Sequence, residues 1–242
     1  MRRIRGVGAV VGVVLAVAGC GNGAEGGAVS GGAGSAREMG GGAVSAGAEV
    51  APGPELPPAP AVPRVSKWEL DPENSSVGFV CKHVLTNVRG MIAQPSGTVV
   101  LDEGTPANSR VDVQMKVSGI STGVEERDMH LRGTEFFDAA RYPVITFVSK
   151  RVSKASDTAY SVTGDLTMHG VTKEVTLAVT APPAFRHAGG IRRGIEATTS
   201  VNRKDFGLMW EFPGEGAGVV VGDVIRITVD AEMVLQEPGN GE

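Results

Sequence analysis

The chain has 242 residues, 41% of them hydrophobic, and a formal net charge of −4 at pH 7. It lacks a basic patch with interleaved aromatic residues, which argues against nucleic-acid binding. Beyond the N-terminus, no apolar run reaches the length of a transmembrane helix.

The N-terminus has the features of an export signal. The basic residues Arg2, Arg3 and Arg5 precede the apolar stretch 6–18, which is shorter than a helix that spans a bilayer. The stretch ends in Val-Ala-Gly-Cys at Cys20. This ending resembles a bacterial lipobox, in which the cysteine becomes the first mature residue and carries lipid.

We therefore expect a lipoprotein signal peptide over residues 1–19 and lipidation at Cys20. The mature protein would be exported and anchored to a membrane of the bacterial cell envelope, facing the periplasm or the cell surface. Several acyl chains give a stable anchor, because each buried methylene adds about 0.8 kcal/mol. The alternative is an ordinary signal peptide cleaved after small residues.

Residues 20–66 form a low-complexity tether that is rich in Gly, Ala and Pro. Its sequence has few aromatic or β-branched residues, so it cannot bury enough apolar surface to offset its ordering entropy. We expect a disordered linker whose Pro-rich part, 51–63, is stiffer and more extended than the rest.

Residues 67–238 form the predicted domain, and strand patterns dominate it. Apolar and polar residues alternate with period two in 109–118, 171–179 and 225–235, which is typical of strands with one buried face. Weaker strand patterns cover 75–84, 92–101, 144–151, 160–168 and 195–201. About eight short strands separated by turns predict an all-β fold, either a sandwich or a closed antiparallel barrel.

One insertion between strands has helical composition. Residues 124–131 carry acidic side chains first and basic ones last, an order that suits the helix dipole. Residues 136–140 are predicted to form a second short helical turn. Both pieces are expected to cap one end of the barrel.

Five sequence motifs carry a family resemblance. They are Glu-Arg-Asp-Met-His-Leu-Arg at 126–132, Phe-Phe-Asp at 136–138, Arg-Tyr-Pro at 141–143, Gly-Asp-Leu-Thr-Met-His-Gly-Val-Thr-Lys at 164–173 and Asn-Arg-Lys-Asp-Phe-Gly-Leu at 202–208. Together they resemble the YceI-like family of polyisoprenoid-binding proteins, from Trp68 to the last strand. The resemblance implies an eight-stranded, lipocalin-like antiparallel β-barrel that binds a polyisoprenoid or similar long-chain lipid and is not an enzyme.

The resemblance also implies a barrel wall and a polar rim. The wall candidates are Phe79, Cys81, Met115, Val117, Phe147, Leu166, Met168, Leu177, Phe206 and Leu208. The rim candidates for a lipid head group are His83, Arg127, His130 and Arg203. An eight-stranded barrel can hold one slender ligand, and strands of about ten residues give a tube of roughly 30 Å.

Each of these assignments has a structural alternative. The barrel interior can be a packed core, because alternation does not distinguish a filled tube from an empty one. Arg127 can bridge to the barrel, with Asp128 capping or pairing, and Arg203 can close the barrel end by hydrogen bonds. His83 can be a hydrogen-bonded core residue, and Cys81 is either a buried inert thiol or a reactive one.

Other chemistries find little support. The four histidines lack the spacing of metal ligands, no Gly-x-Ser-x-Gly elbow is present, and glycine-rich stretches occur only in the linker and loops. We expect no metal and no cofactor apart from the bound lipid. The rival functions are an enzyme that uses His83 or His130 as a general base on such a lipid, and a ligand-free envelope scaffold. Self-association as a homodimer is compatible with either function.

One segment departs from the family pattern. Residues 91–95, Met-Ile-Ala-Gln-Pro, lack the aromatic residue expected after the turn at Gly90. Pro95 has no N–H group for a ladder, so we expect a bulge or an irregular point in this strand.

Overall fold

The computed structural model describes residues 59–83, 86–187, 190–211 and 221–236. All of them belong to one compact unit, Gly53–Glu242. The predicted signal peptide, Cys20 and the linker up to residue 58 lie outside the described residues.

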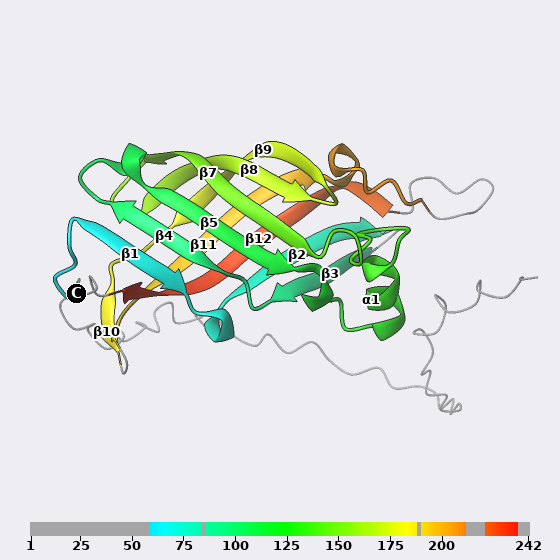
Figure 1. Ribbon diagram of the computed structural model, residues 1–242, viewed down its shortest axis with the longest axis horizontal. Helices are drawn as coiled ribbons and strands as arrows, with labels where there is room; N and C mark the ends of the chain where they lie inside the picture. The colour runs from blue at the N-terminus through cyan, green and yellow to red at the C-terminus, as the bar shows by residue number, and fades with distance from the viewer. Residues whose placement is uncertain (1–58, 84–85, 188–189, 212–220, 237–242) are drawn as a thin grey trace, which may run out of the picture. The chain divides into compact units, whose positions relative to one another are not determined.

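The described chain consists of strands with a few short helices (Figure 1). The strands are β1 (Val65–Leu70), β2 (Ser76–His83), β3 (Thr86–Ala93), β4 (Ser96–Asp102), β5 (Arg110–Lys116), β6 (Ile120–Ser121), β7 (Val144–Lys154), β8 (Ala159–Met168), β9 (Val171–Thr180), β10 (Phe185–His187), β11 (Gly190–Asn202) and β12 (Val221–Gln236). The helices are α1 (Glu125–Arg132) and the 3-10 turns η1 (Pro72–Asn74), η2 (Pro106–Asn108), η3 (Val117–Gly119) and η4 (Arg203–Phe206).

Eight strands close into an antiparallel barrel, as predicted. The ring runs β11, β9, β8, β7, β5, β4, β1 and β12, and pairing between β11 and β12 completes it. The closing pair is long, from Arg192 opposite Val234 to Asn202 opposite Val224. Closure removes the unpaired strand edges that would otherwise invite aggregation.

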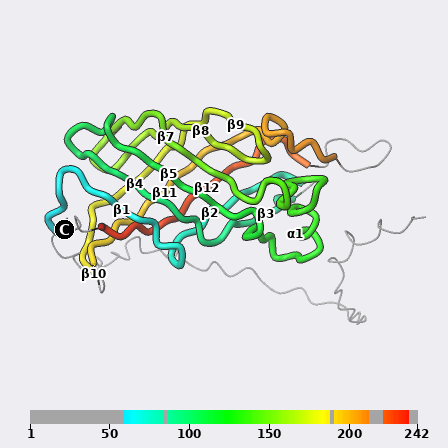
Figure 2. Tube along the Cα trace, viewed as in Figure 1, coloured from blue at the N-terminus to red at the C-terminus, as the bar shows by residue number. Residues whose placement is uncertain are grey.

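Three of the remaining strands, β2, β3 and β6, extend the wall toward one end, whereas β10 pairs with the start of β11 at the other end. β12 pairs with β1 near its C-terminus and with β2 along its N-terminal half, so β1 and β2 act as one long strand interrupted at η1. β3 and β4 form the next long strand, because β2 pairs with β3 and β1 pairs with β4. The trace in Figure 2 shows β2 and β3 continuing toward the end where α1 lies.

The structure confirms the irregular point near Pro95 and corrects two other details. The predicted strand 92–101 is divided, because β3 ends at Ala93 and Gln94 takes a left-handed φ of 55° before Pro95. The strand β1 was not predicted. Residues 136–140 form turns instead of a helix, because Asp138 has a φ of 46° and its N–H group bonds the carbonyl of Gly133.

Two apolar clusters fill different parts of the barrel. The larger cluster includes Phe147, Leu166 and Phe206 and extends to the α1 end. The smaller one surrounds Trp68, which is fully buried and whose indole Nε1 donates to Ser66 Oγ at 2.8 Å. It packs β1, β4 and β12 together at the opposite end.

Candidate functional site

The predicted wall residues come together inside the barrel. Nine of the ten belong to the larger apolar cluster, and the exception is Cys81. The buried members are Met115, Val117, Phe147, Leu166, Met168, Phe206 and Leu208, and the partly buried members are Phe79 and Leu177. Strands far apart in the sequence thus present one continuous apolar surface.

This apolar surface is accessible along one side of the barrel. On β9, Val175 and Leu177 pack against the cluster yet remain partly exposed. On β12, three more side chains pack against the cluster and are partly exposed: Ile225, Ile227 and Val229. An apolar ligand inside the barrel would cover these side chains, and each buried methylene is worth about 0.8 kcal/mol.

Two glycines let aromatic rings lie flat against the wall. A Cβ atom at Gly90 would overlap the ring of Phe79 on the neighbouring strand. At Gly164, a Cβ atom would collide with the ring of Phe147 and with the backbone of β7. The two glycines therefore fix the positions of two predicted wall residues.

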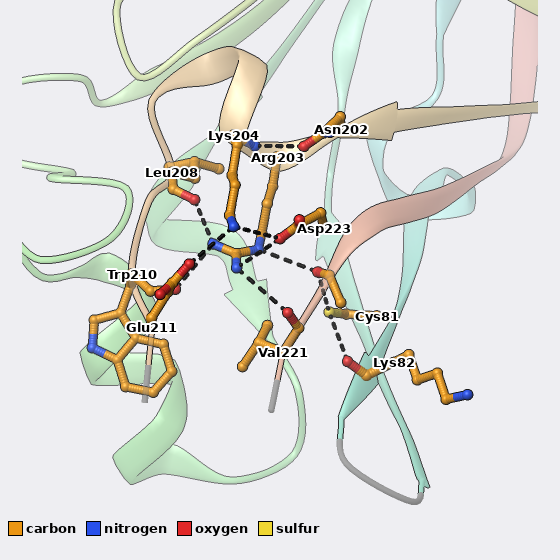
Figure 3. Close-up of polar contacts among 11 residues, drawn as sticks. Cys81, Lys82, Asn202, Arg203, Lys204, Leu208, Trp210, Glu211, Val221 and Asp223 are labelled. Atoms are coloured by element: carbon orange, nitrogen blue, oxygen red, sulfur yellow. Dashed lines mark hydrogen bonds and ion pairs between the residues drawn. The ribbon is translucent and has the colours of Figure 1, made fainter. Parts of the chain in front are cut away.

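Arg203 begins η4 and lies buried at the α1 end of the barrel, 2% exposed (Figure 3). Its Nε atom donates to Gly222 O at 3.2 Å, and Nη1 donates to the carbonyls of Leu208 and Trp210. Nη2 donates to Asp223 Oδ1 at 3.1 Å and to Val221 O at 3.4 Å.

A guanidinium carries five N–H groups, and these contacts account for five donor interactions. The arrangement ties the chain after η4 to the start of β12. It favours the structural alternative for Arg203, in which the side chain closes the barrel end and does not hold a head group.

Cys81 lies beside this network on β2. Its Sγ atom approaches the carbonyls of Lys82 at 3.4 Å and Gly222 at 3.5 Å (Figure 3). Burial raises the pKa of the Cys81 thiol, and the opposing influence of the Arg203 charge is smaller. Because the thiolate is the reactive form, this environment favours the inert alternative.

The polar residues of α1 attach the helix to the barrel. Asp128 is buried and accepts hydrogen bonds from the Thr122 N–H group at 2.8 Å and from Ser121 Oγ at 3.2 Å. Burial alone raises the pKa of Asp128, but hydrogen bonds from the Thr122 hydroxyl, the Thr122 N–H group and Ser121, together with the Arg132 charge, outweigh it and lower the pKa. Arg127 donates from Nε to Thr122 Oγ1 at 2.7 Å, which favours the bridging alternative.

His130 faces the barrel end. Its ring contacts the Trp210 ring edge-on, with centroids 4.9 Å apart, and its Nε2 atom lies 3.3 Å from Glu135 Oε2. Trp210 also accepts the Arg203 hydrogen bond through its carbonyl. His83 ends β2 opposite Val221, another acceptor of Arg203. Three of the four predicted rim residues therefore lie next to Trp210 or Val221: His130 contacts Trp210, His83 pairs with Val221, and Arg203 bonds both carbonyls. Arg127 is bound separately to Thr122.

Sequence reasoning did not assign roles to Tyr142, His169 and Trp210. The Tyr142 ring contacts His169 edge-on at 4.9 Å and lies where a Cβ atom of Gly170 would be. His169 Nδ1 is 3.2 Å from Phe206 O. The motifs at 141–143, 164–173 and 202–208 thus meet in space, and their signal was present only as part of the family resemblance.

The described residues contain no helix long and apolar enough to cross a membrane. In the same ranges, no group of three or more His, Cys, Asp or Glu side chains is placed to hold a metal ion.

The model of the YceI-like domain matches residues 68–233, which is more than half of the chain. The chain belongs to the YceI-like family. A relative from Pseudomonas savastanoi pv. phaseolicola, named UPF0312 protein, is 33% identical over 138 residues, covering 56% of this chain and 72% of the relative.

Solved structures share the fold of this YceI-like domain. BcnA of Burkholderia cenocepacia has a TM-score of 0.57 at 24% identity, covering 67% of this chain and 98% of BcnA. A polyisoprenoid binding domain from Saccharophagus degradans, implicated in plant cell wall breakdown, has a TM-score of 0.53 at 15% identity. That match covers 70% of this chain and 98% of the Saccharophagus domain.

Proposed function

We propose that the barrel binds a polyisoprenoid or similar long-chain lipid and sequesters or carries it. The main observation is the continuous apolar interior, which stays partly accessible at Val175, Leu177 and Ile227. Membership of the YceI-like family and the fold shared with a polyisoprenoid binding domain support the proposal.

The free energy of burying a lipid chain indicates what the apolar interior of the barrel contributes to binding. A chain of forty carbons at about 0.8 kcal/mol each would nominally give roughly 30 kcal/mol, above the ceiling of about 20 kcal/mol for non-covalent binding. Ordering of the lipid and competition from the membrane reduce this value. Burial therefore supplies retention, while the length of the barrel and its polar end supply selectivity.

Native mass spectrometry of the gently purified full chain, followed by organic extraction, tests the proposal. We expect a stoichiometric adduct with isoprenoid mass spacing, and the same spectra report whether the protein is a homodimer. A bare mass that persists after incubation with isoprenoid quinones and polyprenols would favour the scaffold alternative.

A variant of the accessible wall sharpens this test. Leu177→Trp places a large ring where the wall is only partly buried, so it should reduce lipid loading severalfold with little loss of stability. Leu166→Trp also narrows the barrel, but Leu166 is 7% exposed and overpacking there costs about 1–3 kcal/mol.

The matched control is Ala178→Trp, on the exposed outer face of the same strand. Equal loading of Leu177→Trp and Ala178→Trp would contradict the assignment of Leu177 to the wall.

We propose a binding role and no catalytic one. The enzyme alternative requires turnover of an isoprenoid lipid that disappears in His83→Ala or His130→Ala while binding survives. Absence of turnover in the wild-type chain, under conditions in which it carries the lipid, would support the binding role.

We also propose export and membrane anchoring through lipid on Cys20, on the strength of the sequence. Metabolic labelling with an alkyne fatty acid should mark the wild-type chain and fail to mark Cys20→Ala. Equal labelling of both chains would rule out this attachment site.

A further inference from the structure

A pocket of about 290 Å³ lies at the end of the barrel where β1 begins and β7 ends. In Figure 1 this is the end with β10, away from α1. The pocket is lined by the segment before β1, the β7–β8 turn and the loop between β9 and β10. Its polar lining consists of Glu103, Lys154, Asp157, Thr158, Tyr160 and Arg193.

Arg193 forms a buried part of this lining and is 5% exposed. Its Nε atom donates to Pro182 O at 2.8 Å, and Nη2 donates to Ala181 O at 3.3 Å. Nη1 donates to Glu103 Oε1 at 3.0 Å. A guanidinium has five N–H groups, so two of them have no acceptor within the part of the chain that the structure describes.

Tyr160 adds a second buried donor. Its side chain is 8% exposed and lines the pocket, and its hydroxyl takes part in none of the hydrogen bonds between described residues. Lys154 Nζ lies at the pocket edge, 3.4 Å from Asp157 Oδ1. The Tyr160 hydroxyl is not among the fully buried groups that lack a partner, so it reaches the solvent of the pocket and can donate to a ligand there.

The acidic residues of the pocket are much more exposed than the donors. The Glu103 side chain is 45% exposed and that of Asp157 is fully exposed, whereas the Arg193 side chain is 6% exposed. The carboxylates can therefore turn toward solvent while the buried donors stay in place. The interior of the pocket presents N–H and O–H groups to a ligand.

We propose that this pocket binds an oxyanion, a carboxylate or a phosphate, on Arg193 and Tyr160 with help from Lys154. The planar fork of an arginine suits bidentate contact with such groups. The volume suits a small molecule or one head group. Val62 and Ala184 line the same pocket and can contact a short apolar portion.

The oxyanion can belong to a free anion or to a lipid head group, and a titration separates the two. The purified full chain is titrated with inorganic phosphate, geranyl phosphate and geraniol while backbone amide NMR shifts are followed. Shifts at Thr158 and Ala184 with phosphate alone indicate a free anion. Shifts with geranyl phosphate only indicate a head group.

Geraniol, which lacks the oxyanion, should leave the pocket resonances unchanged. Shifts at Thr158 and Ala184 with geraniol equal to those with geranyl phosphate, or no shifts with either phosphate, would overturn the proposal. Failure of this proposal can be distinguished from failure of the proposed function, because lipid loading of the barrel interior is measured separately by mass.

Two mild variants test the donors. Tyr160→Phe removes only the hydroxyl and should weaken oxyanion binding roughly tenfold or more, the contribution of a hydrogen bond to a charged group. Lys154→Gln should weaken it about two- to fivefold, because this cation is more exposed. Arg193→Lys keeps the charge, loses the fork and should weaken binding more than Lys154→Gln.

The controls are Tyr142→Phe, the other tyrosine of the chain, and Lys150→Gln, whose side chain pairs with Asp165 and Glu174. Both should bind like the wild type. If Arg193→Lys does not fold, the oxyanion affinity of Tyr160→Phe still tests the proposal. Unchanged affinity in a folded Tyr160→Phe protein would remove the tyrosine from the site.

Discussion

Arg203 illustrates how one buried charge can define the end of a barrel. Its donors reach carbonyls on both sides of the segment between η4 and β12 and the carboxylate of Asp223. A buried cation is tolerated only where its charge and donors are matched, and here the backbone supplies most of the acceptors. The residue therefore belongs to the architecture of the site more than to its ligand contacts.

Replacing Arg203 should be severely destabilising. Arg203→Gln leaves several buried carbonyls without donors, and we expect a loss of about 3 kcal/mol or more in the free energy of unfolding. Urea denaturation monitored by circular dichroism measures this loss. Lys204→Gln is the control, since Lys204 pairs with Glu211 and Asp223 but is far more exposed than Arg203, so its removal should cost far less. Similar losses in both variants would refute the role of Arg203.

Asp71 should make stability depend on acid pH. Hydrogen bonds from Asn74 and then Arg192 lower its pKa from 3.8 to about 2. Because the folded-state pKa is depressed, its stabilisation is present above pH 4 and is lost as the pH falls toward 2. Asp71→Asn should melt at a lower temperature than the wild type at pH 7, with a difference that shrinks toward pH 2.

Calorimetry across this pH range measures the difference. Asp157→Asn is the control, because that carboxylate is fully exposed and should show no such trend. A difference in melting temperature between Asp71→Asn and the wild type that stays constant at all pH values would contradict the link between the Asp71 pKa and stability.

Among the elements, α1 depends on tertiary contacts. An isolated helix of eight residues is unstable in water, and Val124 provides no side-chain cap. Asp128 and Arg127 instead attach the helix to the segment after β6 through Thr122. The charge order of the sequence predicted the helix, but its position depends on these two residues.

Asp128→Asn should loosen α1 without unfolding the barrel. The variant loses a charge-assisted hydrogen-bond acceptor worth about 1.5–3 kcal/mol, so amide exchange across 121–133 should accelerate roughly tenfold or more. Hydrogen exchange with mass spectrometry measures this rate, and Glu126→Gln, an exposed neighbour, is the control. Exchange unchanged in 121–133 would show that Asp128 does not hold the helix.

On the scale of the whole molecule, the two ends of the barrel differ. The end with Trp68 is closed by a fully buried apolar cluster and carries the pocket around Arg193. The α1 end carries His130, the partly buried Trp210 and the Arg203 network. Because the two ends differ in this way, we expect lipid binding in the barrel to change the environment of Trp210 at the α1 end more than that of Trp68.

The two tryptophans can report on the two ends separately. In Trp68→Phe, lipid loading should reduce acrylamide quenching of Trp210 about twofold or more, because the ligand shields the partly exposed ring. In Trp210→Phe, quenching of Trp68 should be low with and without lipid, since Trp68 is 0% exposed. Unchanged Trp210 quenching in a protein shown by mass to carry lipid would place the ligand away from the α1 end.

Residue patterns along the chain were enough to predict the all-β class, most of the strands and the apolar residues that face inward. Period-two alternation is a local property, so it identifies the buried face of β5, β9 or β12 without knowledge of the partner strand. The break at Pro95 was equally local, because proline lacks the N–H group that a ladder requires.

Which strands pair with one another, and which side chains meet at the barrel ends, became known only from the folded barrel. Closure of the ring places β1 and β2 on the same edge of β12, and it directs the donors of Arg203 to Gly222, Val221 and Asp223. The pocket around Arg193 gathers segments near residues 60, 103, 157 and 183. Such contacts depend on where distant turns meet when the barrel closes, and no local pattern of residues records that geometry.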